Sequence, residues 1–216
     1  MVKVIKVDSL APEISAMRMA AAFARFGMLV VFPTDTVYGL GTNPFNVLAV
    51  DRLLKVKGRL EEMGVPLLVS SVDDVSEIAH FDDDAEKLAK KFWPGVLTLV
   101  LKKRRIIPNI VTGGRDSVAV RIPSHKVARS LAQMVGGVIV GTSANISGKS
   151  SPKTAQEAIE QVGKEVDLVL DGGKASVGVS STIIDLTESP PLIRRLGAVS
   201  EEQIKEVIGD VVRQLE

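Results

Sequence analysis

VIVGTSANISGKSSPK, residues 138 to 153, joins a short apolar run to a polar loop, and the rest of the chain can be read outward from it. The β-branched residues at its start are typical of a buried strand. Ser143 and Asn145 are two apart, so their side chains share one side if the strand geometry continues that far. Ser151 and Pro152 resemble a helix N-cap followed by a first helical proline, which would leave free N–H groups for an anion. The stretch therefore predicts an anion-binding loop at the edge of a sheet.

Two familiar motifs do not fit this stretch. Gly148, Lys149 and Ser150 stand between a strand and a helix as at the end of a P-loop, but that pattern needs a glycine where this chain has Ser143. The segment Thr142-Ser143-Ala144 lacks the second glycine of a nucleophile elbow, and the chain has only two histidines to act as a base. We therefore expect neither a P-loop ATPase nor a serine hydrolase.

Length and composition indicate one globular domain. The chain has 216 residues, of which 45% are hydrophobic and 25% charged, as in ordinary globular domains. The formal net charge is +1, so attraction to phosphate must come from a local cluster of cations. Cysteine is absent, which excludes disulfide and thiolate chemistry. The N-terminal sequence shows no signal segment and no apolar run approaches the ~20 residues of a membrane span, so we expect a single cytoplasmic domain over residues 1–216.

A second polar segment, PTDTVYGLG at residues 33–41, follows a predicted strand over residues 28–32. It places Thr34 and Thr36 two apart and contains Tyr38, the only tyrosine. One interpretation is a turn whose hydroxyls cap its own backbone. The other is a polar pocket wall at the end of a buried strand.

Several cations stand where a ligand could reach them. Lys57 and Arg59 flank the glycine that ends a predicted helix, where they either complement the helix dipole or contact phosphate. Arg121 lies in an apolar strand, where it is costly unless it meets an anion or a carboxylate, so ligand binding is favoured. Of Arg194 and Arg195, which alternate along the chain, one must face inward.

Other charged groups have simpler interpretations. Asp82, Asp83 and Asp84 suit a helix N-terminus better than a metal site, because consecutive side chains cannot all face one ion. His80 and His125 lack partners at ligand spacing. The basic run over residues 102–105 is read either as a solvated loop or as an RNA contact.

Periodicity and capping signals predict alternating strands and helices. The Ser200 and Gln203 pair predicts a capping box for the last helix, and Ser124 is expected to cap an earlier one. Strands are expected over residues 2–7, 28–32, 66–71, 96–101, 117–122, 166–170 and 181–184 and from 138, with helices over 12–26, 47–57, 73–80, 82–92, 124–136 and 152–163 and from 200.

Six stretches in one order resemble a known family. They are PTDTVYGLG (33–41), KGR (57–59), FWPGVLTLVL (92–101), SVAVRIP (117–123), TSANISGKSSP (142–152) and SSTIID (180–185). Together they resemble the YrdC-like family of threonylcarbamoyl-AMP synthases, from about Ala16 to Gly197. The resemblance implies an α+β fold, in which helices cover the faces of a twisted mixed β-sheet around an open basic cavity.

The resemblance also implies a reaction and a site. The reaction is a nucleotidyl transfer that converts L-threonine, bicarbonate and ATP into threonylcarbamoyl-adenylate and pyrophosphate, for modification of adenosine 37 in tRNAs that read ANN codons. Magnesium would enter with ATP, and neither a catalytic side chain nor a resident metal ligand is implied. Thr36, Arg121 and Ser181 would bind threonine, and the nucleotide would be bound by Lys57, Arg59, Ser117, Ser143, Asn145, Ser151 and Arg195.

The chain departs from the family pattern at a few positions. Ser180 replaces the usual glutamate before S-T-I, Leu196 replaces the proline of R-P-G, and Ser70 or Ser71 replaces a frequent histidine. The loop after KGR is about two residues longer than usual. The alternative functions are a module of the same fold that binds double-stranded RNA or tRNA, and carbamoyl transfer as in hydrogenase maturation; the tRNA threonylcarbamoyl-transfer complex is a further candidate partner.

Overall fold

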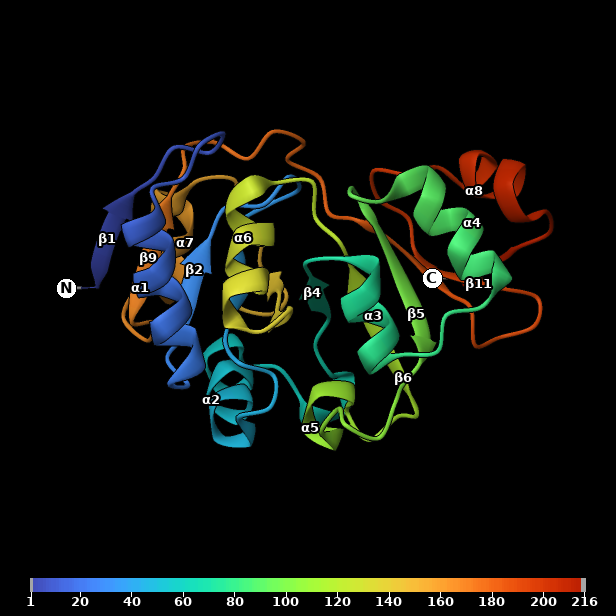
Figure 1. The fold of residues 1–216 in the computed structure, drawn as a ribbon, viewed down its shortest axis with the longest axis horizontal. Coiled ribbons are helices and arrows are strands. Elements are labelled where there is room, and N and C mark those ends of the chain that lie inside the picture. Colours follow the sequence, from blue (N-terminus) through green and yellow to red (C-terminus); the bar gives the residue numbers. More distant parts are fainter. Residues whose placement is uncertain (1, 215–216) are drawn as a thin grey trace.

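A computed structural model describes residues 2–214 as two mixed β-sheets with helices packed on their faces (Figure 1). The first sheet has the order β1 (Lys3–Lys6), β9 (Leu168–Asp171), β2 (Val30–Phe32), β3 (Gly39–Gly41) and β8 (Thr142–Ser143). The second has the order β12 (Val212–Arg213), β11 (Leu192–Arg195), β10 (Thr182–Asp185), β5 (Leu97–Lys102), β6 (Ser117–Arg121), β4 (Leu67–Val69) and β7 (Val138–Val140). The helices are α1 (Ile14–Arg25), α2 (Val47–Lys57), α3 (Val72–Ile78), α4 (Asp83–Phe92), α5 (Asn109–Thr112), α6 (Lys126–Val135), α7 (Ala155–Val162) and α8 (Glu201–Ile208), with a 3-10 turn, η1 (Glu61–Met63). The α+β prediction is confirmed, although the strands divide between two sheets rather than forming one.

The stretch over residues 138–153 is where the chain crosses between the sheets. β7 pairs with β4 in the second sheet, and β8, directly after it, pairs with β3 in the first. Gly141 separates the two strands, and a Cβ atom there would lie 2.2 Å from Cγ of Leu68. Only glycine fits so close an approach, and it allows one short segment to pair in both sheets.

The central strand of the first sheet, β2, is buried on both faces. Val30 and Phe32 of β2 pack in one cluster with α1 and α6, and Val31 between them packs in a second cluster with residues of the other sheet. Figure 1 shows α1 and α6 on one face of the first sheet. Ala20 and Ala24 of α1 are fully buried there, so small side chains allow the helix to approach closely.

Most helix ends follow their local sequence. The side chain of Asn46 caps α2, Gly58 ends it with a left-handed conformation, and Ser200 and Gln203 form the predicted capping box of α8. Two predicted starts are wrong. Ser124 does not cap α6, because its hydroxyl instead donates to Asp35 at 3.1 Å.

The start of α7 is the second error. Its N-cap is Thr154, which accepts from the Glu157 amide at 3.2 Å, and the helix begins at Ala155. The Ser151-Pro152 pair lies before the helix and not at its first turn. Within residues 2–214, no helix has both the length and the apolar character needed to cross a membrane.

Candidate active site

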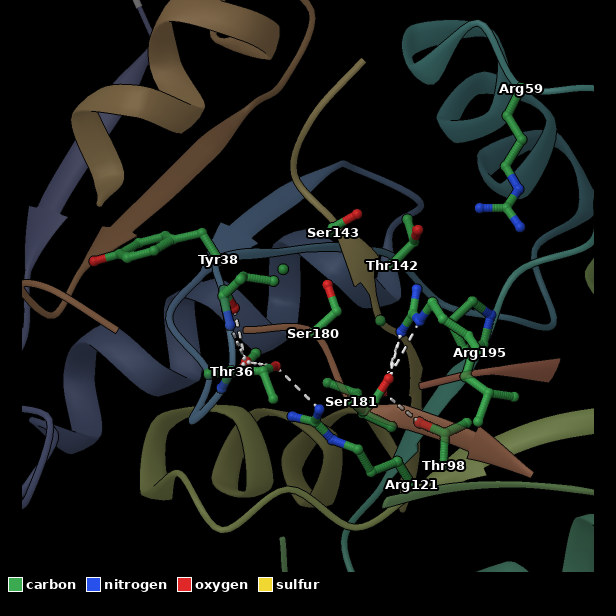
Figure 2. Close-up of a pocket in the computed structure, with 17 residues that line it drawn as sticks. Thr36, Tyr38, Arg59, Thr98, Arg121, Thr142, Ser143, Ser180, Ser181 and Arg195 are labelled. Atoms are coloured by element: carbon green, nitrogen blue, oxygen red, sulfur yellow. Dashed lines mark hydrogen bonds between the residues drawn. The ribbon is translucent and has the colours of Figure 1, made fainter. Parts of the chain in front are cut away.

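A polar pocket lies where the two sheets meet, with walls from both (Figure 2). It encloses about 690 Å3, including space open to solvent. The segment before β3 and the short strand β8 supply one wall, and β4, β5, β6, β10 and β11 supply the other. Threonine and serine hydroxyls dominate the lining, together with the guanidinium groups of Arg59, Arg121 and Arg195.

Arg121 meets a carboxylate, as its place in an apolar strand requires. Its Nη2 lies 2.6 Å from Oδ1 of Asp35, and its Nη1 donates to Oγ1 of Thr36 at 3.0 Å. Both ion-paired side chains are about 5% exposed. Burial lowers the pKa of Arg121, and Asp35 opposes that effect. The buried Nε of Arg121 has no hydrogen-bond partner within residues 2–214.

The hydroxyls of the 33–41 segment serve both roles left open above. Oγ1 of Thr34 accepts from the amides of Thr36 and Val37 and lies 2.9 Å from Oγ1 of Thr36. The same threonines line the pocket. Backbone capping therefore fixes the rotamers of side chains that face the cavity.

Arg195 is the member of the alternating arginine pair that lines the pocket, although both arginines remain exposed to solvent. Its Nη2 donates to the Ser181 carbonyl at 2.8 Å, and Oγ of Ser181 lies 2.8 Å from Oγ1 of Thr98. Burial lowers the pKa of Arg195, and the positive charges of Arg121 and Arg59 lower it further. Arg194 is instead held away from the pocket by Asp185, at 3.0 Å, and by a second carboxylate.

The side chain of Lys57 holds the loop after β8 in place through hydrogen bonds to its backbone. Its ammonium donates to the main-chain carbonyls of Ser143 and Asn145, the latter at 2.7 Å. The side chain is almost fully buried, and burial, assisted by the nearby charge of Arg59, lowers the pKa of Lys57 to about 7. Asn145 donates to two carbonyls within the same loop, Ile146 at 2.9 Å and Lys149 at 2.8 Å. These two residues shape the wall without lining it.

Six of the ten residues predicted to bind ligands line this pocket, and four do not. Ser117 lies further along β6, at a second pocket that also contains Lys102 and Asp185. Ser151 immediately precedes Pro152, whose carbonyl accepts from the amide of Tyr38. The other two residues that do not line the pocket are Lys57 and Asn145. The six that line it are Thr36, Arg59, Arg121, Ser143, Ser181 and Arg195.

Further hydroxyl residues line the pocket that sequence reasoning did not assign to it. Thr98 is the one polar residue in the first five positions of β5, which was a usable signal. Ser180, seen only as a departure from the family pattern, is part of the wall, as is Thr142. Thr34 and Tyr38 also line it, as the pocket-wall interpretation of residues 33–41 predicted. The hydroxyl of Tyr38 donates to the Gly173 carbonyl at 2.6 Å, and burial raises its pKa to about 12, so it acts as a neutral donor.

The other charged clusters have local partners. Asp82 caps α4 by accepting from the Ala85 amide at 2.8 Å. In the basic run, Lys103 donates to Asn109 at 2.7 Å and Arg104 donates to the Ser76 carbonyl at 2.6 Å. Within residues 2–214, histidine and carboxylate side chains do not gather into a group of three that could hold a metal ion.

The chain is similar in sequence to characterised proteins over most of its length. The model of the Sua5–YciO–YrdC family, described as "Telomere recombination", matches residues 22–197. A threonylcarbamoyl-AMP synthase of Pyrococcus abyssi is 45% identical over 90% of this chain and 57% of that relative. The threonylcarbamoyl-AMP synthase of Idiomarina loihiensis is 37% identical over 68% of this chain and 83% of that relative.

Solved structures agree with the sequence matches. A crystal structure of P. abyssi Sua5 complexed with L-threonine superposes with a TM-score of 0.94 at 42% identity. The alignment covers 98% of this chain and 62% of that one. The chain therefore spans about three fifths of the length of the P. abyssi proteins it matches.

Proposed function

We propose, because this chain belongs to the Sua5–YciO–YrdC family, that it is an L-threonylcarbamoyladenylate synthase, a nucleotidyltransferase acting on L-threonine, bicarbonate and ATP. The observation that carries the proposal is the convergence of Arg59, Arg121 and Arg195 on one hydroxyl-lined pocket. Asp35 neutralises Arg121, whereas Arg59 and Arg195 have no carboxylate partner within residues 2–214, so an anion in the pocket would offset their mutual repulsion. ATP and the carboxylate of threonine are anions of the required kind, and residues 1–216 would act as one cytoplasmic domain.

Threonine would bind on the β6 side of the pocket. Arg121, oriented by Asp35 and Thr36, would meet the amino-acid carboxylate in a charge-assisted pair. Ser181, held by Thr98, adds a hydroxyl on the same side. Support comes from the 42% identical P. abyssi protein, which was solved with L-threonine.

The nucleotide would bind between Arg59, Ser143 and Arg195. Lys57 and Asn145 hold the loop that carries Ser143. Ser117 and Ser151, the other two residues predicted to bind the nucleotide, would extend the nucleotide site on either side.

Magnesium would enter the site bound to ATP, as part of a MgATP substrate. The carboxylate beside the pocket, Asp35, is already paired with Arg121. A triphosphate and water can supply the oxygen ligands that magnesium prefers. The residues present thus fit an ion that arrives on the nucleotide, which neutralises charge on the phosphates.

The chemistry requires orientation more than a protein acid or base. Bicarbonate takes up a proton and loses water to give carbon dioxide. The amine of threonine adds to that carbon dioxide and loses a proton, giving a carbamate. A carbamate oxygen then attacks the α-phosphorus in line, and the bond from phosphorus to the pyrophosphate oxygen breaks. Arg59 and Arg195 would stabilise charge on the phosphates, while Arg121 holds the attacking molecule in place.

The product would serve tRNA modification at adenosine 37, with the tRNA threonylcarbamoyl-transfer complex as its recipient. A stand-alone RNA-binding role is less well supported. Two of the four cations in the 102–105 run, Lys103 and Arg104, already donate to groups of this chain.

The test combines the protein with labelled bicarbonate, L-threonine, ATP and magnesium. We expect pyrophosphate and a labelled adenylate to form together, in amounts that depend on threonine. Pyrophosphate release that is independent of threonine would refute the synthase assignment.

Arg121→Lys examines the threonine site directly. Lysine keeps a cation beside Asp35 but cannot pair with Asp35 and a second carboxylate in the same fork geometry. We expect kcat/KM for threonine to fall about 100-fold, equivalent to ~2.7 kcal/mol. Arg105→Ala, which removes an exposed arginine of the basic run, is the control, and equal kinetics in the two variants would contradict the assignment.

A further inference from the structure

The loop over residues 60–64 follows directly from Arg59, yet it buries little of its own surface. Leu60 is 70% exposed and Met63 is 53% exposed. Its internal hydrogen bonds are those of one short turn, from Met63 to Leu60 at 3.1 Å and from Gly64 to Glu61 at 3.0 Å. A segment with so few buried contacts opens easily unless something outside it holds it.

Arg115 supplies an external anchor. Its Nη1 donates to the Glu62 carbonyl at 2.6 Å, and its Nη2 donates to the Met63 carbonyl at 2.8 Å. The rigid guanidinium fork suits two adjacent acceptors, which a lysine ammonium cannot bind in the same way. Because both acceptors are main-chain atoms, the anchor fixes the path of the backbone.

Two glycines allow the backbone of the loop to lie directly against the turn after α5. A Cβ atom on Gly113 would lie 2.3 Å from the Glu62 carbonyl oxygen, and one on Gly64 would lie 2.8 Å from that of Val111. The amide of Val65 donates to the same Val111 carbonyl at 2.7 Å. The loop and the turn are therefore in direct backbone contact beside the bonds from Arg115.

The anchored loop also contacts Arg59. The Met63 carbonyl that accepts from Arg115 also accepts, at 3.4 Å, from Nη2 of Arg59. The buried Nε of Arg59 has no partner within residues 2–214. Burial lowers the pKa of Arg59, and the positive charge of Arg115 lowers it further. Two guanidinium groups thus share one carbonyl, and an anion beside Arg59 would relieve their repulsion.

We propose that Arg115 is a positioning residue that holds the 60–64 loop so that Arg59 points its guanidinium at the phosphates of ATP. The proposal rests on the synthase function above. Figure 2 shows Arg59 on the opposite side of the pocket from Arg121, so the effect is confined to the nucleotide, and threonine binding is independent of the anchor.

Steady-state kinetics test the selectivity of this effect. In Arg115→Ala we expect KM for ATP to rise about tenfold, equivalent to ~1.4 kcal/mol, while KM for threonine changes less than about twofold. Arg115→Lys should fall between Arg115→Ala and the unmodified protein, because it restores one donor. Arg105→Ala, which removes an arginine charge without touching the loop, should leave both constants unchanged. Equal rises in the two KM values in Arg115→Ala would overturn the proposal.

Hydrogen exchange read by mass spectrometry tests the anchor without using activity. Amides of Met63 and Gly64 should exchange faster in Arg115→Ala than in Arg105→Ala, while the amides of β5 keep their rates. Unchanged exchange in the loop would overturn the proposal. If the unmodified protein shows no threonine-dependent pyrophosphate release, the synthase assignment fails separately, and calorimetric titration with MgATP then replaces KM in comparing the two variants.

Discussion

The three arginines of the pocket differ in the groups that their guanidinium side chains contact: one pairs with a carboxylate, and two donate to main-chain carbonyls. Arg121 is neutralised by an ion pair with Asp35 at 2.6 Å. Arg195 instead donates to the Ser181 carbonyl, and Arg59 donates weakly to a main-chain carbonyl. A carbonyl satisfies hydrogen-bonding capacity but leaves the net charge in place. Arg59 and Arg195 are therefore suited to phosphate, and Arg121 to the geometric recognition of a carboxylate.

Asp35→Ala should destabilise the protein by about 3 kcal/mol, because it leaves Arg121 buried without its counter-charge. Urea unfolding followed by circular dichroism measures the loss. The double variant Asp35→Ala with Arg121→Met should recover most of it, since no buried charge then remains unpaired. A double variant as unstable as the single one would contradict this account of the ion pair.

The lowered pKa of Lys57 predicts that the free energy of unfolding depends on pH. Burial lowers its pKa from 10.5 to about 7 in the folded protein, so between these values the unfolded chain binds the proton more tightly. The cost of the buried charge is present in full below pH 7 and is relieved as the pH rises toward 10.5. The free energy of unfolding should therefore gain up to ~1.4 kcal/mol per pH unit from this group above pH 7.

Lys57→Met isolates that contribution. Urea unfolding at pH 7, 8 and 9 should show a smaller rise of unfolding free energy with pH in the variant, because all other titrating groups are common to both proteins. Parallel pH profiles for the two proteins would show that Lys57 keeps an ordinary pKa.

Helix ends show what local sequence can and cannot determine. The caps of α2 and α8 were predictable because Asn46 and Ser200 each immediately precede the periodic run of their helix. Before α7, the Ser151-Pro152 pair and Thr154 offer similar chemistry. Glu157 was the deciding signal, since it stands three residues after Thr154 and its side chain accepts from the Lys153 amide at 2.7 Å. Tertiary packing then fixes α7 at the later start.

Thr154→Ala should lower the unfolding free energy by about 1 kcal/mol through loss of the α7 cap. Ser151→Ala, at the mispredicted cap, should change it by less than about 0.5 kcal/mol. Thermal or urea unfolding of the two variants side by side provides the measurement. The reverse order of effects would place the functional start of α7 at Ser151.

Across the whole molecule, the sequence could identify six of the pocket residues but not their pairings. Resemblance to a family brought together six residues that line one cavity, although they stand between positions 36 and 195. It could not show that Asp35 pairs with Arg121, or that Lys57 binds two carbonyls, because both contacts join segments more than eighty residues apart. The division into two sheets escaped prediction for the same reason: strand partners are set by packing between distant segments.

Because the pocket has walls from both sheets, a ligand should stabilise them together. L-threonine and MgATP, each at about 100 times its dissociation constant, should each add ~2.7 kcal/mol to the free energy of unfolding. Fluorescence of Trp93, the only tryptophan, reports on the second sheet, and far-UV circular dichroism reports on the whole chain. The two urea midpoints should rise equally, and a shift confined to one signal would show that the sheets unfold separately.

Strand order also governs how a copy of this protein emerges from the ribosome. β2 and β3 are made early, but the partner of β2 on its other side is β9, from much later in the chain. The nascent first sheet therefore waits with an open edge for most of translation. Arg121, Ser143 and Arg195 are synthesised in that order, so the pocket is incomplete until β11 has been made.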